Sequence, residues 1–234
     1  MTTLLIATRN LHKLGEIRAI LGEAHAYLTL ADFPDAPPLI EDADTFEGNA
    51  ARKALTLARW LGGKAGGFPV VRRGSEIPVA VWPDFILADD SGLEVDALGG
   101  APGVRSARFA ASDSGASGSN SSDGANNAKL LRLLRNVPWD QRTARFRCVL
   151  AVARPSPEDA TGGPAFFEGV CEGHIAFEPR GAGGFGYDPL FIPEGFEQTF
   201  AELGETVKNR LSHRARALAK FREWLERRAA TAAL

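Results

Sequence analysis

Two short apolar runs that end in polar residues most constrain the fold of this chain. Residues 3–8 (TLLIAT) precede a helical repeat of apolar residues over 14–21. Residues 85–88 (FILA) are fully apolar, as expected of a strand covered on both faces, and lead directly into Asp89-Asp90. In open α/β sheets, ligands bind beyond the carboxyl ends of such strands. The sequence therefore predicts an α/β fold with a ligand site at these strand ends.

The start of the first predicted helix carries an unusual charge. Asn10 is the expected N-cap, which places Lys13 in the first turn. A cation there opposes the helix dipole unless an anion lies nearby. The pattern indicates a bound phosphate.

Three further helices are predicted from a capping residue followed by an apolar stripe. Asn49 and Lys53, four residues apart, share one face of the first of them. The caps are Thr45, Asp123 and Ser212, and the stripes are Ala50-Ala54-Leu57-Leu61, Leu130-Leu131-Leu133-Leu134 and Leu218-Phe221-Leu225.

Strands and irregular segments complete the predicted pattern. Residues 145–153 and 166–177 are expected to form a half-buried antiparallel pair. Residues 62–84 are expected to form a long excursion that contains a small hairpin. Residues 112–127 are polar and rich in glycine and serine, which favours a flexible linker or lid.

Composition and charge exclude several classes of function. The chain has 234 residues, of which 44% are hydrophobic and 24% charged, as in folded globular proteins, and we expect residues 1–234 to form a single domain. A net charge of −2 gives no overall field that would attract a nucleic acid polymer. Cys148 and Cys171 lack a C-x-x-C spacing and are expected to be small buried side chains. Because no apolar run approaches the roughly 20 residues that span a bilayer, and no basic leader precedes the first strand, we expect a cytoplasmic protein without a membrane partner.

Four features together are typical of a metal-assisted nucleotide phosphate site. Each alone is weak, because glycine-rich loops mostly form turns and acidic pairs mostly lie on surfaces. The features are the helix start with Lys13, the carboxylate pair Asp89-Asp90, the glycine-rich loop around Phe185, and the cationic helix start His213-Arg214.

Six motifs in order along the chain carry a family resemblance. They are 7–16 (ATRNLHKLGE), 45–50 (TFEGNA), 88–95 (ADDSGLEV), 99–103 (GGAPG), 183–189 (GGFGYDP) and 212–214 (SHR). On these motifs the chain resembles the inosine triphosphate pyrophosphatase (dITP/XTP pyrophosphatase) family along nearly its whole length. The resemblance implies an elongated two-lobed α/β fold, with a central twisted mixed sheet flanked by helices and a nucleotide cleft between the lobes. It also implies a homodimer, a Mg²⁺ cofactor, and hydrolysis of purine nucleoside triphosphates to monophosphate and pyrophosphate.

The resemblance assigns the phosphate and metal residues position by position. Thr8, Asn10 and Lys13 would hold the triphosphate, within a substrate-binding segment that also contains Arg9, Leu11 and His12. Lys53 resembles a second phosphate-binding lysine, and Ser91 resembles a substrate contact. Glu41 and Asp90 would bind Mg²⁺, and Asp90 would be the general base. The alternatives are that Lys53 is a solvated helix charge and that Glu41 is one acid among several in an exposed loop.

The resemblance also assigns the base pocket. Phe185 would stack on the purine, with Gly186, Tyr187 and Asp188 shaping the pocket. Lys208, His213 and Arg214 would donate to the C6 carbonyl that distinguishes hypoxanthine and xanthine from adenine. Guanine carries the same carbonyl, so these donors do not explain how GTP is rejected. The alternative for Phe185 is a core aromatic that follows a glycine bend.

The chain departs from the family pattern at three places. Gly48 stands where a glutamate would complete a capping box with Thr45. Arg9 stands where glycine is common, and residues 62–84 are longer than the usual link. Two other functions remain open at this point. One is a pyrophosphatase that prefers pyrimidine or modified bases, which Ser212-His213-Arg214 disfavours. The other is a non-catalytic nucleotide-binding module, which the presence of Asp90 disfavours.

Overall fold

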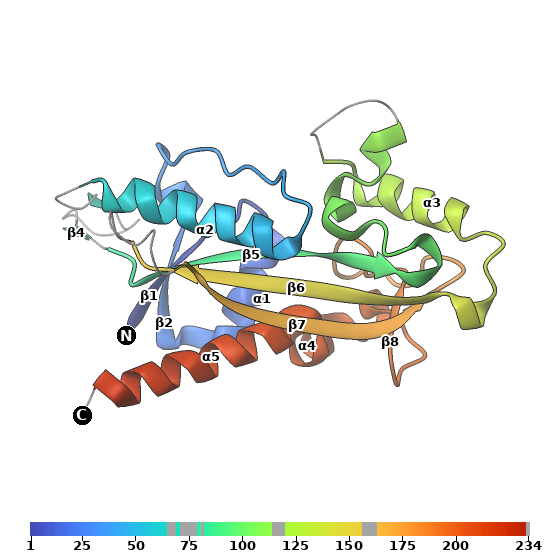
Figure 1. The fold of residues 1–234 in the computed structure, drawn as a ribbon. Coiled ribbons are helices and arrows are strands. Elements are labelled where there is room, and N and C mark those ends of the chain that lie inside the picture. The colour runs from blue at the N-terminus through green and yellow to red at the C-terminus, as the bar shows by residue number, and fades with distance from the viewer. Residues whose placement is uncertain (65–68, 71–78, 81, 114–119, 156–162, 233–234) are drawn as a thin grey trace. The chain divides into compact units, whose positions relative to one another are not determined.

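The fold comprises two compact units. The computed structural model describes residues 1–64, 69–70, 79–80, 82–113, 120–155 and 163–232 (Figure 1). The first unit comprises Met1–Asp90, Val149–Phe167 and Trp224–Leu234, and the second unit comprises Ser91–Cys148 and Glu168–Glu223. Both units are therefore assembled from segments far apart in the sequence. The nucleotide cleft expected between two lobes stays a prediction.

Six strands form one sheet in the order β2-β1-β5-β6-β7-β8. They are β1 (Thr2–Ile6), β2 (His25–Thr29), β5 (Phe85–Val95), β6 (Thr143–Ala153), β7 (Ala165–Ile175) and β8 (Phe191–Pro193). Strand β1 is parallel to β2 and to β5, whereas β7 is antiparallel to β8. The sheet is thus mixed, which confirms the predicted α/β class.

A separate two-stranded sheet lies within the excursion that the sequence predicts. Strand β3 (Pro69–Val70) is antiparallel to β4 (Val79–Ala80), with Val70 opposite Val79. The predicted hairpin is therefore confirmed. The remaining predictions for this excursion fall on residues 65–68, 71–78 and 81, which lie outside the described residues.

Five α-helices and six short 3₁₀ helices complete the described elements. The α-helices are α1 (Leu11–Leu21), α2 (Phe46–Gly62), α3 (Asp123–Leu133), α4 (Phe200–Leu211) and α5 (His213–Ala232). The 3₁₀ helices are η1 (Gly22–Ala24), η2 (Leu30–Asp32), η3 (Asp96–Leu98), η4 (Gly103–Arg108), η5 (Ala110–Asp113) and η6 (Trp139–Gln141).

Three predicted helix caps are confirmed and one is corrected. The side chains of Asn10 and Thr45 accept backbone N–H bonds at the starts of α1 and α2, and Ser212 Oγ accepts from the backbone of α5. Helix α3, however, is capped by Ser122, whereas Asp123 is its first helical residue. Asp123 therefore has a helical backbone, and its side chain is available for another contact.

Other boundaries also differ from the prediction. Strand β5 continues through Asp89-Asp90 to Val95, so the acidic pair lies inside the strand and not beyond its end. Within the predicted flexible segment 112–127, residues 123–127 are helical, and 114–119 lie outside the described residues. Helix α4 is absent from the sequence-based prediction.

The core of the first unit is built on strand β1 and helix α2. Leu4 and Leu5 of β1 are fully buried. The four residues of the predicted α2 stripe are also fully buried, and burying a leucine side chain contributes about 1.5–3 kcal/mol. They are Ala50, Ala54, Leu57 and Leu61.

The core of the second unit contains an aromatic layer. Phe146 packs against Phe191 with a ring separation of 4.7 Å, and Phe191 packs against Phe200 at 5.3 Å. Leu130 of α3 and its C-cap Leu134 are buried in this unit, whereas Leu133 is 45% exposed and does not belong to the predicted apolar face.

A glycine in β7 lets α5 begin directly against the strand. A Cβ atom on Gly169 would lie 2.0 Å from the carbonyl oxygen of His213 and 2.5 Å from the backbone nitrogen of Ala217. No larger residue fits without moving the helix. Gly169 therefore fixes where His213 and Arg214, both predicted site residues, lie within the second unit.

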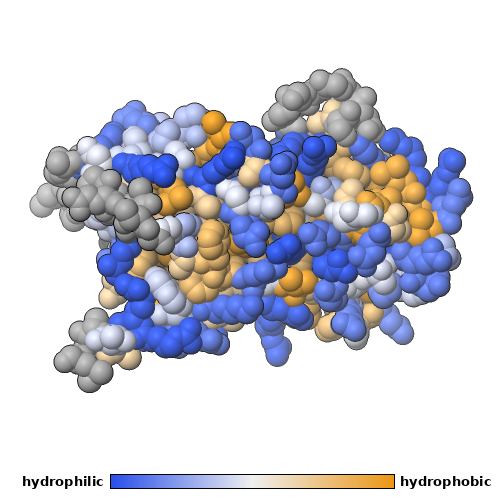
Figure 2. All heavy atoms as spheres, viewed as in Figure 1, coloured by the Kyte–Doolittle hydropathy of each residue, from blue (hydrophilic) through white to orange (hydrophobic). Residues whose placement is uncertain are grey.

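Hydrophilic and hydrophobic residues both reach the surface on the face drawn in Figure 2. A mixed surface is normal for a globular protein, because apolar atoms supply more than half of its accessible area. None of the described helices combines the length and apolar character needed to cross a bilayer.

Candidate active site

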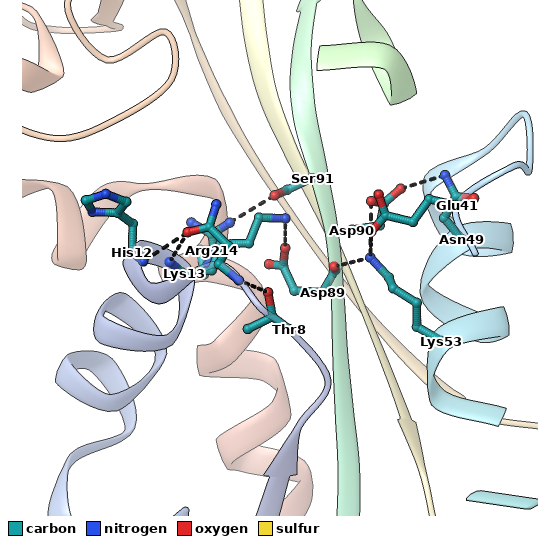
Figure 3. Close-up of polar contacts among 11 residues, drawn as sticks. Thr8, His12, Lys13, Glu41, Asn49, Lys53, Asp89, Asp90, Ser91 and Arg214 are labelled. Carbon is teal, nitrogen blue, oxygen red and sulfur yellow. Dashed lines mark hydrogen bonds and ion pairs between the residues drawn. The ribbon is translucent and has the colours of Figure 1, made fainter. Parts of the chain in front are cut away.

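The two aspartates of β5 point in opposite directions. Figure 3 shows the Asp89 side chain directed toward α1 and the Asp90 side chain directed toward α2. Successive side chains of a strand alternate between its faces, so the pair cannot chelate one ion together. The first unit therefore has two separate sets of polar side chains, one on each side of β5.

On the α1 side, Asp89 forms an ion pair with the predicted phosphate lysine. Lys13 Nζ lies 2.5 Å from Asp89 Oδ1, and the Asp89 side chain is only 1% exposed. The pair neutralises the cation that made the start of α1 unusual. Asp89 is thus the anionic partner of Lys13 in this structure, a role that the sequence did not reveal.

The loop before α1 is closed by its own hydrogen bonds. Asn10 Oδ1 accepts from the backbone nitrogens of His12 and Lys13, at 2.9 and 3.2 Å, and Thr8 Oγ1 accepts from the backbone nitrogen of Asn10 at 3.1 Å. Two backbone donors of the first turn are therefore occupied by the cap. Arg9 and Leu11 of the same segment are exposed.

On the α2 side, four residues form a connected group that we call the Asp90 cluster: Glu41, Asn49, Lys53 and Asp90 (Figure 3). Asn49 Nδ2 donates to Asp90 Oδ2 at 3.0 Å. Lys53 Nζ lies 2.6 Å from Glu41 Oε1 and 3.4 Å from Asp90 Oδ1, and it donates to the backbone oxygen of Asp89 at 2.7 Å. The i, i+4 spacing on α2 thus brings both polar side chains to Asp90.

Burial and charge act against each other in this cluster. Burial raises the pKa of Asp90 above that of an ordinary aspartate, although Lys53, Lys13 and the bond from Asn49 lower it and Glu41 raises it. Burial lowers the pKa of Lys53, but the Asp90 and Glu41 carboxylates outweigh it, so the net shift is upward. Lys53 is thus a buried ammonium, not the solvated helix charge that was the alternative.

The two predicted metal ligands suit a divalent ion bound by few protein groups. The Glu41 and Asp90 carboxylates converge on one cation, the ammonium of Lys53. Among the described residues there is no group of three or more histidine, cysteine and acidic side chains placed to hold a metal. Two carboxylates, with water and phosphate oxygens completing the shell, match the way proteins hold Mg²⁺. The residues therefore fit the implied ion.

In the second unit, two predicted site residues bind each other. The Arg214 guanidinium donates to Ser91 Oγ at 2.9 Å (Figure 3), and the residue is only 1% exposed. The neighbouring His213 ring stacks on Phe146 at 4.7 Å with an interplanar angle of 13°. The start of α5 is thus held in place by the core and by Ser91.

The glycine-rich segment 183–188, which we call the Phe185 loop, is tightly folded around Asp188. Asp188 Oδ2 accepts from the backbone nitrogen of Phe185 at 2.9 Å and from Lys208 Nζ at 2.5 Å. The Lys208 ammonium also lies 4.4 Å from the centre of the Phe185 ring, within the range of a cation–π contact. Phe185 is half-buried, which contradicts the alternative that it is a core aromatic.

Tyr187 of the same loop serves as an internal anchor. Its hydroxyl donates to the backbone oxygen of Ser106 at 2.9 Å, and the residue is 4% exposed. Burial, with a smaller contribution from Asp123, raises the pKa of Tyr187 above its ordinary range. Tyr187 therefore anchors the Phe185 loop to the backbone of Ser106.

Within each unit the structure brings predicted site residues together, and it adds several partners. Asn49, Asp89, Asp123 and Asn127 contact predicted site residues, although the family resemblance did not assign them to the site. For Asn49, the i, i+4 spacing to Lys53 could have indicated that its side chain faces the same site. For the other three, the partners are far away in sequence.

One departure from the family pattern has a structural reason. A Cβ atom on Gly48 would lie 2.8 Å from Ala43 Cβ and 3.0 Å from Thr45 Oγ1. Residue 48 thus has little room for a side chain in this chain, and Thr45 caps α2 through the backbone nitrogen of Gly48 alone.

Comparisons with known proteins agree with these features. Residues 4–224 match the model of the Ham1 family. The dITP/XTP pyrophosphatase of Shouchella clausii is 43% identical over 97% of this chain and 98% of its own length, and that of Geobacter sulfurreducens is 47% identical over 96% and 97%. The structure of a HAM1 protein from Coxiella burnetii superposes with a TM-score of 0.75 at 34% identity, covering 97% of this chain and all of that one. The resemblance in the motifs is therefore confirmed, and the chain belongs to the Ham1 family.

Proposed function

We propose that this protein hydrolyses non-standard purine nucleoside triphosphates, such as ITP, dITP, XTP and dXTP, to the nucleoside monophosphate and pyrophosphate. One observation carries the proposal. A buried carboxylate, Asp90, is oriented by Asn49 and faces the Lys53 ammonium, in a chain that aligns over 97% of its length with a dITP/XTP pyrophosphatase. The reaction would remove deaminated purines from the nucleotide pool.

The first unit supplies the groups for the triphosphate. Lys13 and Lys53 are held by carboxylates in this structure. A triphosphate forms charge-assisted hydrogen bonds with ammonium groups and competes for them with those carboxylates. Thr8 and Asn10 shape the loop at the start of α1, where the helix dipole favours an anion. The substrate would thus replace internal ion pairs with phosphate contacts.

Asp90 is proposed to take the proton of the attacking water as the anhydride between the α and β phosphates is cleaved. Burial raises the pKa of Asp90 in the metal-free protein, which makes the carboxylate a stronger base than an exposed aspartate. Asn49 holds one carboxylate oxygen and so fixes the direction of the other. Mg²⁺ held by Glu41 and Asp90 would neutralise charge on the phosphates and on the departing pyrophosphate.

The second unit supplies the groups for the base. Lys208, His213 and Arg214 are each at most 4% exposed. Buried donors that meet an adenine amino group instead of a carbonyl stay unpaired, which costs about 1–3 kcal/mol for each lost bond. Phe185, half-buried beside the Lys208 ammonium, would stack on the purine. These contacts would favour hypoxanthine and xanthine over adenine.

We further propose a homodimer, which rests on the family resemblance alone, and action in the cytoplasm, as expected from the sequence. Light scattering coupled to size-exclusion chromatography should give twice the monomer mass of 25.0 kDa. A mass equal to that of one chain at micromolar concentration would exclude the dimer.

The direct test of the function is pyrophosphate release from a panel of nucleotides. Purified protein is incubated with dITP, XTP, dATP, dGTP and dTTP, with Mg²⁺ or with EDTA. We expect turnover of dITP and XTP to exceed that of dATP by about 100-fold or more, because a site with several buried donors rejects a mismatched base strongly. EDTA should abolish turnover. Equal rates with dITP and dATP, or preference for dTTP, would remove the base assignment.

The metal assignment has a matched pair of variants. Glu41→Gln removes a proposed ligand, whereas Asp44→Asn removes an exposed carboxylate of the same connecting segment. We expect Glu41→Gln to raise the Mg²⁺ concentration needed for half-maximal rate, and Asp44→Asn to leave it unchanged. The same Mg²⁺ requirement in both variants would contradict the assignment of Glu41.

A further inference from the structure

The first turns of α3 hold both backbone polar groups of a single residue in the Phe185 loop. Asp123 Oδ2 accepts from the backbone nitrogen of Gly186 at 2.6 Å. One helical turn later, Asn127 Nδ2 donates to the backbone oxygen of Gly186 at 3.0 Å. A helix more than 50 residues earlier in the chain thus fixes the peptide next to Phe185.

Gly186 is the point of the loop that most needs such an anchor. Its φ angle is +63°, in the left-handed region, and a Cβ atom on it would meet no other atom within 4 Å. No side-chain packing therefore holds this residue from the Cβ side. Its neighbours on either side, by contrast, have their own contacts, through Asp188 for Phe185 and through Ser106 for Tyr187. At Gly186 the loop depends on the two side chains of α3.

The orientation of Asn127 supports this dependence. The residue is 8% exposed, and within the described part of the chain its Oδ1 atom is buried without a hydrogen-bond partner. Turning the amide over would put Oδ1 against the Gly186 carbonyl oxygen, two acceptors facing each other. The amide therefore keeps its donor on Gly186 and leaves its acceptor unsatisfied, which is rare for a buried polar group and calls for an explanation.

We propose that Asp123 and Asn127 are positioning residues that orient Phe185 for the purine and thereby set the base selectivity. The inference deepens the proposed function and rests on it, because it takes the Phe185 loop as the base-binding segment. The two residues act through the Gly186 backbone and need not touch the nucleotide. Their loss should therefore affect KM and substrate choice more than kcat.

The test compares two adjacent residues of α3. Asp123→Ala removes the acceptor for Gly186, whereas Ser122→Ala removes the N-cap, whose hydroxyl accepts from the backbone nitrogen of Ala125. Both weaken the start of the helix, but only the first releases the loop. Asp123→Asn retains an acceptor oxygen, and Asn127→Asp places an oxygen opposite the Gly186 carbonyl. Each variant is measured for kcat and KM with dITP and dATP, and for the rate of hydrogen exchange at the Gly186 amide.

We expect Asp123→Ala and Asn127→Asp to raise KM for dITP about tenfold, with kcat within about threefold of wild type, and to lower the preference for dITP over dATP. Exchange at Gly186 should accelerate at least about tenfold. Ser122→Ala should leave KM, preference and exchange unchanged, and Asp123→Asn should recover most of the preference.

Two outcomes overturn the inference: unchanged exchange and KM in Asp123→Ala, or equal losses in Ser122→Ala. Failure of the proposed function has a different signature. Exchange at Gly186 would then accelerate in Asp123→Ala although the wild-type enzyme shows no preference for dITP. In that result the anchor is established and the base assignment is lost.

Discussion

In the Asp90 cluster, a metal ion would compete for the carboxylates and a phosphate would compete for the ammonium, whereas the contacts of the Phe185 loop hold the backbone of that loop in place. Glu41, Asp90 and Lys53 pair with one another, so a ligand must exchange these contacts. Asp188 binds the backbone of Phe185, and Asp123 binds that of Gly186. The ion pairs of the Asp90 cluster can be exchanged for contacts with a ligand, whereas the contacts of the Phe185 loop keep its backbone rigid. Changes in the first should therefore alter turnover and metal affinity, and changes in the second should alter substrate choice.

The largest effect is expected at the carboxylate itself. Asp90→Asn should lower kcat for dITP about 1,000-fold, the range expected when a general base is removed, while nucleotide binding is largely retained. Asp89→Asn is the matched control, because Asp89 points to the opposite face of β5 and pairs with Lys13. Single-turnover rates and equilibrium binding of dITP distinguish the two variants. Near wild-type turnover in Asp90→Asn, or an equal loss of turnover in Asp89→Asn, would contradict the different roles assigned to the two faces of β5.

A smaller effect is expected in the rigid region. A Cβ atom on Gly184 would lie 2.2 Å from Asp188 Oδ2, and its φ angle is +74°. Gly184→Ala should displace Asp188 from Phe185 and Lys208 and raise KM for dITP about tenfold, which corresponds to roughly 1.4 kcal/mol.

The control for this variant separates collision from backbone strain. Gly195 has a φ angle of +83°, but a Cβ atom on it would meet no other atom within 4 Å. Gly195→Ala carries the same left-handed strain, about 1–2 kcal/mol, without a clash. It should lower the thermal unfolding midpoint and leave KM unchanged. A rise in KM in both variants would mean that strain, and not the Asp188 contact, controls the loop.

The smallest expected effect tests whether the Lys53 ammonium competes with Mg²⁺ for the two carboxylates. Lys53→Met removes the cation that the two carboxylates share, so Mg²⁺ should bind the free protein about fivefold more tightly, or roughly 1 kcal/mol, by calorimetry at pH 8. Turnover should fall, because a phosphate contact is lost. Lys64→Met removes a lysine just beyond α2 that contacts Trp60. Weaker Mg²⁺ binding in Lys53→Met than in Lys64→Met would show that the ammonium does not compete with the ion.

Much of the local structure followed from sequence because its causes are local. The caps Asn10, Thr45 and Ser212, and the α2 stripe, depend on residues within one or two helical turns. Helix α4 has a comparable local signal, the capping box of Thr199 and Glu202, although the sequence-based prediction does not include this helix. The length of β5 was misjudged, because a run of polar residues inside a buried strand depends on partners from other elements.

The partners within the site could not be predicted in the same way. Asp89 meets Lys13 across 76 residues, and Gly186 meets Asp123 across 63. Periodicity places each residue on a face of its own element but does not say which element lies opposite. The family resemblance assigned a site role to one member of each pair and none to the other. Long-range pairing of this kind requires the three-dimensional structure.

The burial of the two native cysteines has a practical consequence for labelling experiments. Cys148 and Cys171 are free and at most 2% exposed, and burial raises the pKa of Cys171 to about 11. Alkylating reagents attack the thiolate, which is scarce at neutral pH for such a group. A cysteine introduced on the surface should therefore react with a maleimide dye or spin label well before the native pair. Movements of individual segments could then be followed by spectroscopy in the otherwise natural chain.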